Sequence, residues 1–532
     1  MAFFLVMAHG PLLQLPYYWD EAGQFIPAAS DIYHSGALIP YSAIPNVHPP
    51  GVMAWLALAW RVAGYSIVTA RVAMLLIAAF GLLVPFLLSI ELSRGSTGTP
   101  AFITVTLLFL CPLFYAQSML AQLDMPAMAF TALALLLFLQ NRFRACALAC
   151  AVLVLVKETG FVAPLVFGGW LLFERRAPGD NRRDVLWFLL PVGLLAIWLC
   201  ALRHFTGFWF GNASFTKYNA VDTLDPVRVL FALVRRAYYL FIGSGHIIGT
   251  AIVWFAWKRM PILKDRPWRI ALTLAAAQIL TVSVLGGAVL ERYLLPVLPI
   301  LYSAFALAAG ALSIGTRRVA IGALVVALIA ANFVNPPYPF PFENNLMFVT
   351  FTDIAQQAAF AADRYNQPVT TTFPMTTALA HPRNGYLMLP HRTHEIPDFR
   401  PETIQPLVAR PPALMIVYNT EFDPWGLRGT ELFEWFFAKY YNYERPMSAL
   451  EISQLLNMRI AREWESRGFS MALLVNDGLN GPVGRRFGAA AGLPAGADTR
   501  PYAASAERAA LNRRMAASTY TTAAMAIAPP SP

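Results

Sequence analysis

Charged side chains are scarce in this sequence. Asp, Glu, Lys and Arg make up 13% of its 532 residues, whereas 57% are hydrophobic. The mean hydropathy of +0.51 lies outside the range of ordinary soluble proteins. The shortage of charge therefore predicts a polytopic α-helical membrane protein. The formal net charge of +10 does not indicate nucleic-acid binding, because short Arg-rich loops between apolar spans give the same excess.

Cysteine is scarce too, and the common nucleotide and metal motifs are missing. The four cysteines (Cys111, Cys146, Cys150 and Cys200) all lie in apolar runs. They predict neither a disulfide framework nor a zinc site. The sequence has no H-E-x-x-H, Walker loop, Rossmann glycine fingerprint or nucleophile elbow, so it does not predict the enzyme classes that depend on them.

Long apolar runs follow one another through the first two thirds of the chain. Residues 1–16 lack a basic n-region and a cleavage site, and they are shorter than a span, which indicates a clipped first helix or a misassigned start. Residues 51–64 are also too short to cross and are predicted to lie at the membrane interface. The predicted crossings are 70–91, 100–118, 126–140, 144–156, 159–173, 185–202, 238–257, 268–286, 291–312 and 318–333. With the N-terminal piece, they predict about eleven helices in a transmembrane domain over residues 1–333.

Lys and Arg recur in every second connection between these runs. The cations are Arg94; Arg142 and Arg144; Arg175, Arg176, Arg182 and Arg183; Lys258, Arg259, Lys264, Arg266 and Arg269; and Arg317 and Arg318. The positive-inside rule places these five connections in the cytoplasm and the acidic loop of residues 17–64 outside. An odd number of helices then places everything after Asn335 outside as well. Arg-rich usage and the absence of eukaryotic targeting signals favour a bacterial inner membrane.

The composition changes at about residue 334, where the Pro-rich segment NPPYPFPFENN leaves the last apolar run. The elements predicted beyond it are strands at 368–373, 413–418 and 471–475 and helices at 427–443 and 448–467. Residues 334–484 therefore predict a small extracytoplasmic α/β domain. The tail of residues 485–532, rich in Ala, Arg and Pro, is predicted to be disordered.

Two external connections carry carboxylates to the same membrane surface. Asp20 and Glu21 follow the aromatic cluster YYW, which sets their depth at the interface. Alone, such a pair is most often a solvated loop face. Asp124, in LDMP, lies in the next outward connection at a helix start. A site shared by Asp20 and Asp124 is favoured over simple helix capping by Asp124, which stays open.

Other ionisable groups lie at outward-facing turns. Lys157 and Glu158, in VKETG, interrupt an apolar stretch, and a mutually neutralising pair stays an open alternative. Arg292, next to Tyr293 in ERYLLPVLP, is a cation on the side where cations are scarce, and an anionic ligand at the interface would explain it. His48, in HPPG, fits a surface histidine and a site residue equally well. Snorkelling is the open alternative for three further outward cations: Arg71, Arg235 and Arg236.

These motifs, in this order, resemble the GT-C class of membrane glycosyltransferases that use polyprenyl-phosphate sugars, including protein O-mannosyltransferases and the aminoarabinose transferases acting on lipid A. The matching stretches are WDEA, HPPG, LDMP, VKETG and ERYLLPVLP, over about residues 15–312. The resemblance implies that Asp20 is the catalytic carboxylate, Asp124 the second-loop aspartate, and Lys157 and Arg292 contacts to the donor phosphate. Some relatives have a carboxylate where this chain has Val47, so a divalent metal stays open and no cofactor is certain.

The physical argument and the resemblance predict one reaction. A prenyl tail lies among the helices with its phosphodiester at the interface, where Arg292 and Lys157 stabilise the developing phosphate charge. Asp20 takes the proton of an acceptor hydroxyl as it attacks the anomeric carbon, and Asp124 orients Asp20 or the acceptor. Single displacement inverts the anomeric centre. The further residues predicted to contact substrate are Glu21, His48 and Tyr293.

The predicted partners are a polyprenyl-phosphate sugar, membrane lipid, and an acceptor that is a protein, lipid A or another glycan. The alternative class is a secondary transporter or lipid flippase, in which intramembrane charges mark a path. Against it, the charges gather on one side, and the sequence shows neither repeated halves nor Gly/Pro-broken helices at mid-span. A non-catalytic scaffold that presents the outer domain is a third class.

Overall fold

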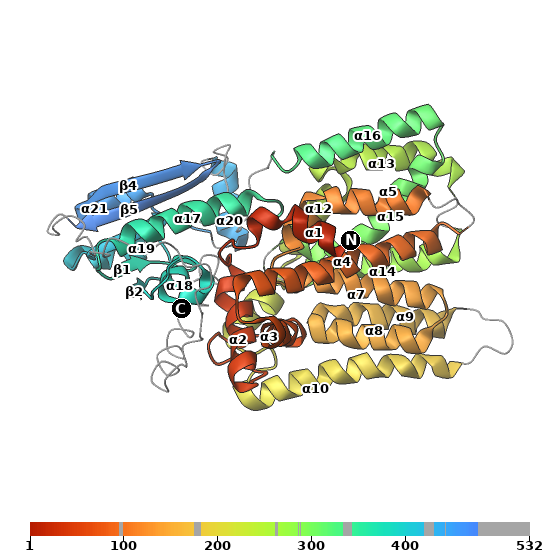
Figure 1. The fold of residues 1–532 in the computed structure, drawn as a ribbon, viewed down its shortest axis with the longest axis horizontal. Coiled ribbons are helices and arrows are strands. Elements are labelled where there is room, and N and C mark those ends of the chain that lie inside the picture. Colours follow the sequence, from red (N-terminus) through yellow and green to blue (C-terminus); the bar gives the residue numbers. More distant parts are fainter. Residues whose placement is uncertain are drawn as a thin grey trace.

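The computed structural model describes residues 1–94, 99–174, 182–260, 264–285, 287, 289–333, 343–419, 430–441 and 443–476. Figure 1 shows a bundle of helices lying side by side, with a sheet and its own helices at one end. The tail predicted to be disordered, the Pro-rich residues 334–342 and the cations Arg175 and Arg176 lie outside the described residues.

The bundle consists of apolar helices. Its helices are α1 (Ala2–Ala8), α4 (Ile67–Leu92), α5 (Thr99–Leu110), α6 (Pro112–Gln117), α7 (Asp124–Leu139), α8 (Phe143–Val156), α9 (Val162–Phe173), α10 (Leu189–Thr206), α11 (Ala213–Thr216), α12 (Pro226–Phe241), α13 (His246–Ala256), α14 (Arg266–Val284), α15 (Leu298–Gly310) and α16 (Ile314–Ala330). Within the described residues, four helical segments are long and apolar enough to cross a membrane, or five if the bent pair of α12 and α13 is one span: the four are Ile67–Leu92, Arg183–Thr206, Arg266–Val284 and Glu291–Gly310. The chain is a multi-pass membrane protein, and the predicted count of about eleven crossings stays a prediction.

Two predicted crossings differ from the helices that form. The run 100–118 is divided between α5 and α6 at Pro112, whose ring cannot continue the hydrogen-bond ladder of the preceding helix. The run 238–257 belongs to a longer pair, α12 and α13, which bends by 41°. The bend lies at Gly243–Gly245, where Ser244 has φ +53° and Gly245 has φ +83°. The predicted absence of glycine-broken helices is therefore wrong at this position.

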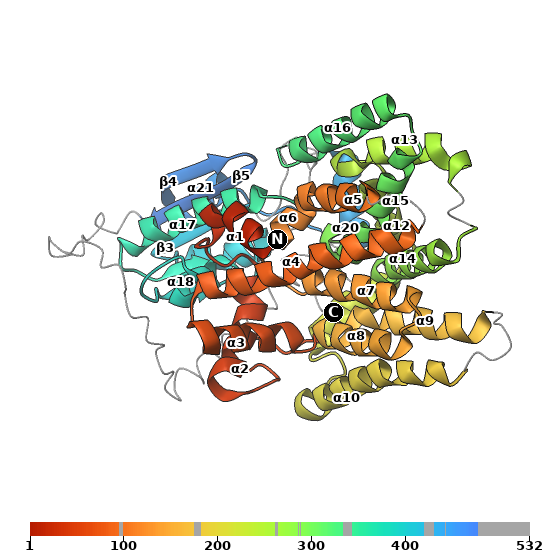
Figure 2. The same cartoon turned by 45° about the vertical axis from the view of Figure 1, so that its right-hand side comes forward.

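Short elements cover the end of the bundle that faces the sheet. They are a π-helix at Glu21–Phe25, α2 (Ile26–Ser35) and α3 (Gly51–Ala63). Figures 1 and 2 both show α2 and α3 next to the sheet-containing part. The 13 residues of α3 match the interfacial segment predicted at 51–64. A Cβ on Gly51 would lie 2.5 Å from the carbonyl oxygen of Leu155, so only glycine lets α3 begin against the end of α8.

The C-terminal part contains a five-stranded sheet in the order β2-β1-β3-β5-β4. Its strands are β1 (Val369–Thr371), β2 (Thr393–Glu395), β3 (Leu414–Tyr418), β4 (Met458–Ser466) and β5 (Phe469–Asn476). Its helices are α17 (Met347–Asp363), α18 (Met375–Ala380), α19 (Pro401–Ile404), α20 (Glu431–Tyr441) and α21 (Ala449–Leu456). β1 pairs in parallel with β2 and β3, whereas β5 is antiparallel to β3 and β4, and α17 packs on the sheet.

The three predicted strands correspond to β1, β3 and β5, but the helix predicted at 448–467 is wrong over its second half. α21 ends at Leu456, because Asn457 adopts a left-handed conformation with φ +50°. β4 then begins at Met458 and returns through Arg467 and Gly468, both at positive φ, into β5. The turn between β4 and β5 consists of Arg467 and Gly468 alone. The sequence offered no longer break there, so β4 was assigned to the preceding helix. The domain boundaries drawn at 333, 334 and 484 stay predictions.

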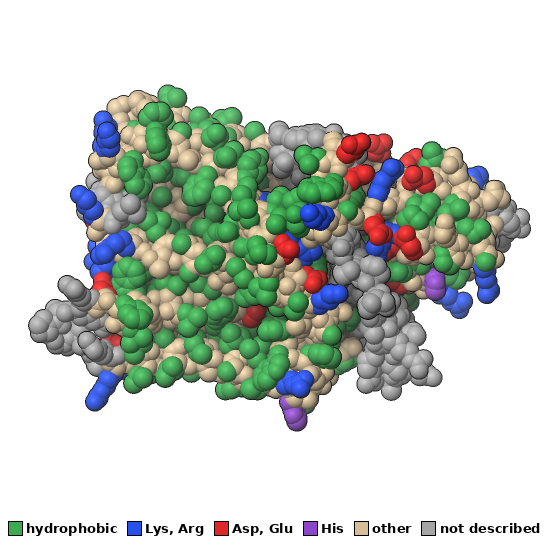
Figure 3. All heavy atoms as spheres, turned by 180° about the vertical axis from the view of Figure 1, so that it is seen from behind, with side chains coloured by type: hydrophobic (Ala, Val, Ile, Leu, Met, Phe, Trp, Pro, Cys, Tyr) green, Lys and Arg blue, Asp and Glu red, His purple; other side chains and the backbone are tan. Residues whose placement is uncertain are grey.

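Charge is distributed unevenly along the molecule. Figure 3 shows Lys and Arg side chains at the end of the bundle away from the sheet, whereas Asp and Glu gather near the junction. Exposed cations at the distant end include Arg94, Arg142, Lys258 and Arg318. This polarity agrees with the positive-inside argument.

Candidate functional site

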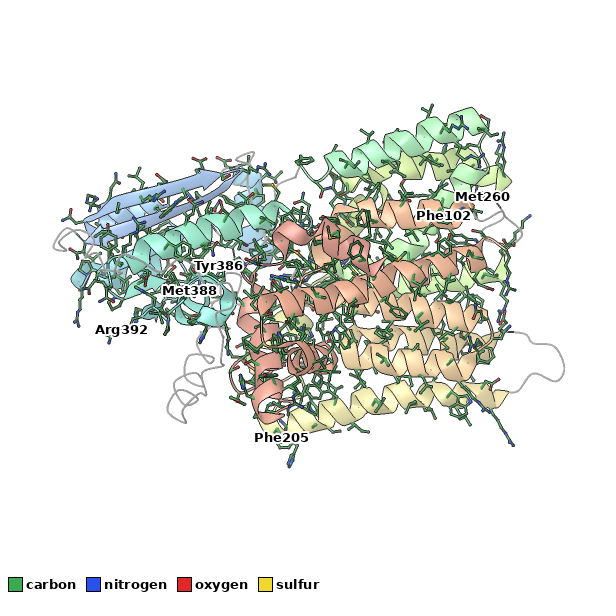
Figure 4. The ribbon with its side chains drawn as sticks, in the orientation of Figure 1. Phe102, Phe205, Met260, Tyr386, Met388 and Arg392 are labelled. Carbon is green, nitrogen blue, oxygen red and sulfur yellow. The ribbon has the colours of Figure 1, made fainter. Side chains whose placement is uncertain are left out.

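The loop that carries Asp20 is held by the C-terminal part. The amide of Tyr17 donates to the carbonyl oxygen of Asn384 at 3.0 Å, and the hydroxyl of Tyr386 donates to the carbonyl oxygen of Tyr17 at 3.2 Å. Figure 4 shows Tyr386 at the junction of the two parts. A Cβ on Gly23 would lie 2.5 Å from the ring of Phe373, so the π-helix packs directly on residues of the sheet-containing part.

Asp20 stands at the start of that π-helix, a form that is rare and often marks functional positions. The preceding residue, Trp19, has φ +41°, which is unusual for a bulky side chain. Its ring packs against Phe351 and Phe373. The Asp20 side chain is 31% exposed and its Oδ2 accepts from Nη2 of Arg292 at 2.5 Å. Asp20 is therefore both anchored and accessible.

Arg292 is the centre of the charge network. It lies in the 3₁₀ helix Glu291–Val297, which leads into α15, and its side chain is 7% exposed. Nη1 donates to Glu343 and Nη2 to Asp20. Nε lies 3.3 Å from Oδ2 of Asp124 but makes no hydrogen bond. Three carboxylates thus surround one guanidinium.

Asp124 and Lys157 form the second half of the network. Asp124 lies in the first turn of α7, where a negative charge is favoured by the helix dipole. Nζ of Lys157 donates to Oδ1 of Asp124 at 2.5 Å and lies 4.1 Å from the centre of the Tyr293 ring. Arg292 and Arg236 also lie within 6 Å of that ring. The structure therefore brings Asp20, Asp124, Lys157, Arg292 and Tyr293 together, and Asp124 does more than cap a helix.

His48 borders this network through Glu158. Its Nδ1 lies 2.8 Å from Oε2 of Glu158, the neighbour of Lys157 in sequence. The HPPG turn is held against the bundle by Gly51, which touches α8, and by Trp198, whose Nε1 donates to the carbonyl oxygen of Val47 at 2.8 Å. Lys157 and Glu158 each have a closer partner, Asp124 and His48 respectively, and the alternative of a mutually neutralising pair at this turn stays open.

Glu21 has a different environment from its neighbour Asp20. It is fully buried and pairs with Arg71, which is fully buried as well. Its carboxylate also accepts from the amide of Ala121 at 2.6 Å and the amide of Tyr18 at 3.0 Å. Glu21 therefore ties the loop to the connection before α7, and the structure gives it no exposed face toward a substrate. Because the Arg71 side chain is fully buried, it does not extend its charge to the membrane surface, and the alternative of snorkelling is wrong for this residue.

Glu343 is the site residue that sequence reasoning missed. It lies before α17, its side chain is 5% exposed, and Nε2 of Gln122 donates to its Oε1 at 2.9 Å. Burial raises the pKa of the Glu343 carboxyl to about 7, against the opposing effect of Arg292. One signal was present: Glu343 is the only acidic residue between Glu291 and Asp353.

The chemistry of this cluster follows from its charges. Three carboxylates and two cations share a buried volume at the end of apolar helices, and the two cations can exchange a carboxylate for another oxyanion. Among the described residues, no group of three or more His, Cys, Asp or Glu side chains could hold a metal ion. A divalent metal stays a prediction from sequence.

No family model matches the sequence, and no curated protein matches it. Among solved structures, the chain is similar to ArnT from Cupriavidus metallidurans bound to undecaprenyl phosphate, with a TM-score of 0.54 and 14% identity over 88% of this chain and 97% of that one. The apo state of the same ArnT gives a TM-score of 0.51 at 13% identity, with 88% and 97% covered. The chain therefore has a GT-C-like fold, and the fold resemblance inferred from the five motifs is confirmed.

Proposed function

We propose that this chain is a membrane glycosyltransferase that moves a sugar from a polyprenyl-phosphate donor to an acceptor hydroxyl on the extracytoplasmic face. The observation that carries the proposal is Arg292 surrounded by three carboxylates beside Lys157, next to apolar helices. Buried cations at a membrane interface suit a phosphodiester whose lipid tail lies among those helices. The GT-C-like fold supports it, since the similar ArnT binds undecaprenyl phosphate.

The proposed reaction is a single displacement. The acceptor oxygen attacks the anomeric carbon, the bond from that carbon to the phosphate oxygen breaks, and the bonding electrons leave with polyprenyl phosphate. Arg292 and Lys157 stabilise the charge that develops on the phosphate. Asp20 takes the acceptor proton, because it is the most exposed carboxylate of the network, at 31% against 4% for Asp124 and 5% for Glu343. The anomeric centre is inverted.

The remaining residues position these groups. Asp124 holds Lys157 at 2.5 Å and faces Arg292, so it sets the distance between the two cations. The ring of Tyr293 packs against the ammonium group of Lys157. His48 contacts Glu158 and so orders the turn that contains Lys157. Glu21 acts through the loop backbone rather than on substrate. We place the protein in a bacterial inner membrane with its C-terminal part outside, and the acceptor is a protein, lipid A or another glycan.

The direct test is to incubate the purified protein with a panel of polyprenyl-phosphate sugars and acceptors and to measure released polyprenyl phosphate. Wild-type protein is expected to release it, and Asp20→Asn is expected not to. Asp353→Asn, which removes an exposed carboxylate on α17, is the matched control and should keep the wild-type rate. Release that is equal in the wild type and in Asp20→Asn would exclude the proposed base.

One observation favours a lipid flippase as the second candidate. The pair α12 and α13 bends by 41° at Gly243–Gly245, and helices broken within the membrane are typical of transporters. The two functions differ in whether the polyprenyl-phosphate sugar is cleaved. A flippase would move a fluorescent polyprenyl-phosphate sugar across a proteoliposome membrane without cleaving it, whereas the proposed enzyme cleaves it on one side.

A further inference from the structure

α20 is rich in aromatic side chains and lies against the bundle. Six of its eleven residues (Glu431–Tyr441, ELFEWFFAKYY) are Phe, Trp or Tyr, whereas these types make up 13% of the whole chain. Figures 1 and 2 both show α20 at the side of the C-terminal part that borders the bundle. Aromatic residues, Trp and Tyr above all, gather at the boundary between water and lipid. The composition of α20 therefore suits a position at that boundary.

One face of α20 is fixed to the start of α12. The ring of Phe231 packs against the rings of Phe436 and Tyr441, with centroids 5.2 Å and 6.0 Å away. Arg228, in the first turn of α12, donates from Nε to the carbonyl oxygen of Tyr440. Its guanidinium carbon lies 4.7 Å from the centre of the Tyr441 ring. These contacts hold α20 beside the end of α12 that borders the C-terminal part.

α12 presents an apolar stripe to its surroundings. The pair that it forms with α13 is long and apolar enough to cross a membrane. Its exposed residues are all apolar or aromatic and recur at helical spacing, so that they share one face. They are Pro226, Leu230, Val234, Ala237, Tyr238 and Phe241. In a membrane span such a face contacts lipid. Because α20 packs on Phe231, the neighbour of Leu230, it lies next to this stripe.

The outer side of α20 has the pattern of a helix that lies in a lipid interface. Leu432 is 75% exposed and Trp435 54% exposed, and their spacing of three residues places them on one face. Nζ of Lys439, one turn beyond Trp435, lies 5.2 Å from the centre of the Trp435 ring. Glu434 is turned by about 200° from Leu432 and so lies on the opposite side. An apolar face flanked by a long cation lets the ammonium group reach lipid phosphates.

We propose that α20 lies in the bilayer interface, with Leu432 and Trp435 among the lipid chains beside α12 and Lys439 at the lipid phosphates. The occupant of this face is the lipid of the surrounding membrane, because the face adjoins the lipid-facing stripe of the span on which α20 is fixed. Lipid contact at α20 then sets the distance of the C-terminal part from the membrane. The inference needs only the membrane span, so it holds for a transferase and for a flippase alike.

The test places a nitroxide label at single cysteines of the full-length protein, with the exposed Cys200 replaced by Ala, in nanodiscs of phosphatidylethanolamine and phosphatidylglycerol. Collision of the label with oxygen, which concentrates in lipid, is compared with collision with a nickel chelate, which stays in water. The ratio of oxygen to nickel collisions is expected to be several-fold higher at Leu432→Cys than at Glu434→Cys, the matched control on the opposite side of α20. Leu230→Cys, on the α12 stripe, is the lipid reference.

Two results would overturn the proposal. If the label at Leu432→Cys meets the nickel chelate as often as the label at Glu434→Cys, α20 lies in water. If it is shielded from both reagents, protein covers the face, and dipolar broadening that disappears on dilution with unlabelled protein would identify that cover as a second copy of the chain. Trp435→Cys gives an independent position on the same face if Leu432→Cys fails to fold.

Discussion

Asp20 and Arg292 are 272 positions apart in the sequence, yet Oδ2 of Asp20 lies 2.5 Å from Nη2 of Arg292. The contact joins the loop that follows α1 to the 3₁₀ helix that leads into α15. It also joins the predicted base to the predicted phosphate ligand, so a change in either group acts on the other. The experiments on these residues therefore need separate measurements of binding and of turnover.

Asp20→Asn keeps the size of the side chain but cannot accept a proton from the acceptor. Turnover is expected to fall by about 100-fold or more, while donor binding survives. The measurement is release of polyprenyl phosphate alongside donor binding on the same preparation. A variant with near-normal turnover would show that another group is the base.

Arg292→Ala is expected to weaken donor binding by about 2–4 kcal/mol, because a buried, hydrogen-bonded charge loses its partner. Arg292→Lys should recover only part, since a single ammonium cannot replace two parallel donors. The measurement is the donor dissociation constant of folded protein. Unchanged affinity in Arg292→Ala would return the residue to a structural role.

Glu21→Gln tests whether the residue next to Asp20 stabilises the fold and takes no part in catalysis. The change leaves the buried charge of Arg71 without its counter-ion, so the free energy of unfolding is expected to fall by about 3–5 kcal/mol. The measurement is thermal unfolding in detergent beside Asp20→Asn, which should unfold close to wild type. A Glu21→Gln protein with the wild-type midpoint and no turnover would instead make Glu21 the catalytic group.

Gly23→Ala tests how the C-terminal part supports the loop. The added methyl would lie 2.5 Å from the Phe373 ring, so the loop has to shift and turnover is expected to fall more than donor binding. Phe373→Leu should restore part of the lost turnover in the double variant by making room for the methyl group. Equal turnover in Gly23→Ala and wild type would show that the contact does not set the position of Asp20.

The orientation can be tested by labelling single cysteines with an impermeant thiol reagent in cells whose outer membrane is opened. Cys200, the exposed member of the four cysteines, is first replaced by Ala. Cysteine at Ser35 or Thr430 should label, whereas cysteine at Gln140 should be protected. The reverse pattern would overturn the topology and, with it, the external position of the site.

Much of the site could be predicted because its residues are unusual where they stand. Asp20, Asp124, Lys157 and Arg292 are ionisable groups among apolar runs on the side where cations are scarce, and such groups require partners. The residues that each of these groups contacts were less predictable from the sequence. Asp20 and Glu21 are neighbours with equal chemistry, and only the fold shows that one faces Arg292 while the other is buried with Arg71.

The fold was predictable where hydropathy is unambiguous and not where polar residues interrupt it. The crossings that became α4, α7 and α8 have continuous apolar runs. α12 escaped prediction because Arg228, Arg235 and Arg236 lower its hydropathy, although Arg235 pairs with Glu291 and Arg236 donates to the carbonyl oxygen of Val282. Glu343 was missed because a single carboxylate after a Pro-rich segment has no periodic pattern.

The hydrogen bond between Tyr17 and Asn384 has a consequence for how the protein is made. Tyr17 is made early in synthesis, whereas Arg292, Phe373 and Asn384 follow hundreds of residues later. Until they arrive, Asp20 lacks its ion pair with Arg292, and the first loop lacks its contacts with the C-terminal part. We expect a chain released early from the ribosome to enter the bilayer yet remain inert, so that activity appears only when nearly the whole polypeptide has been exported.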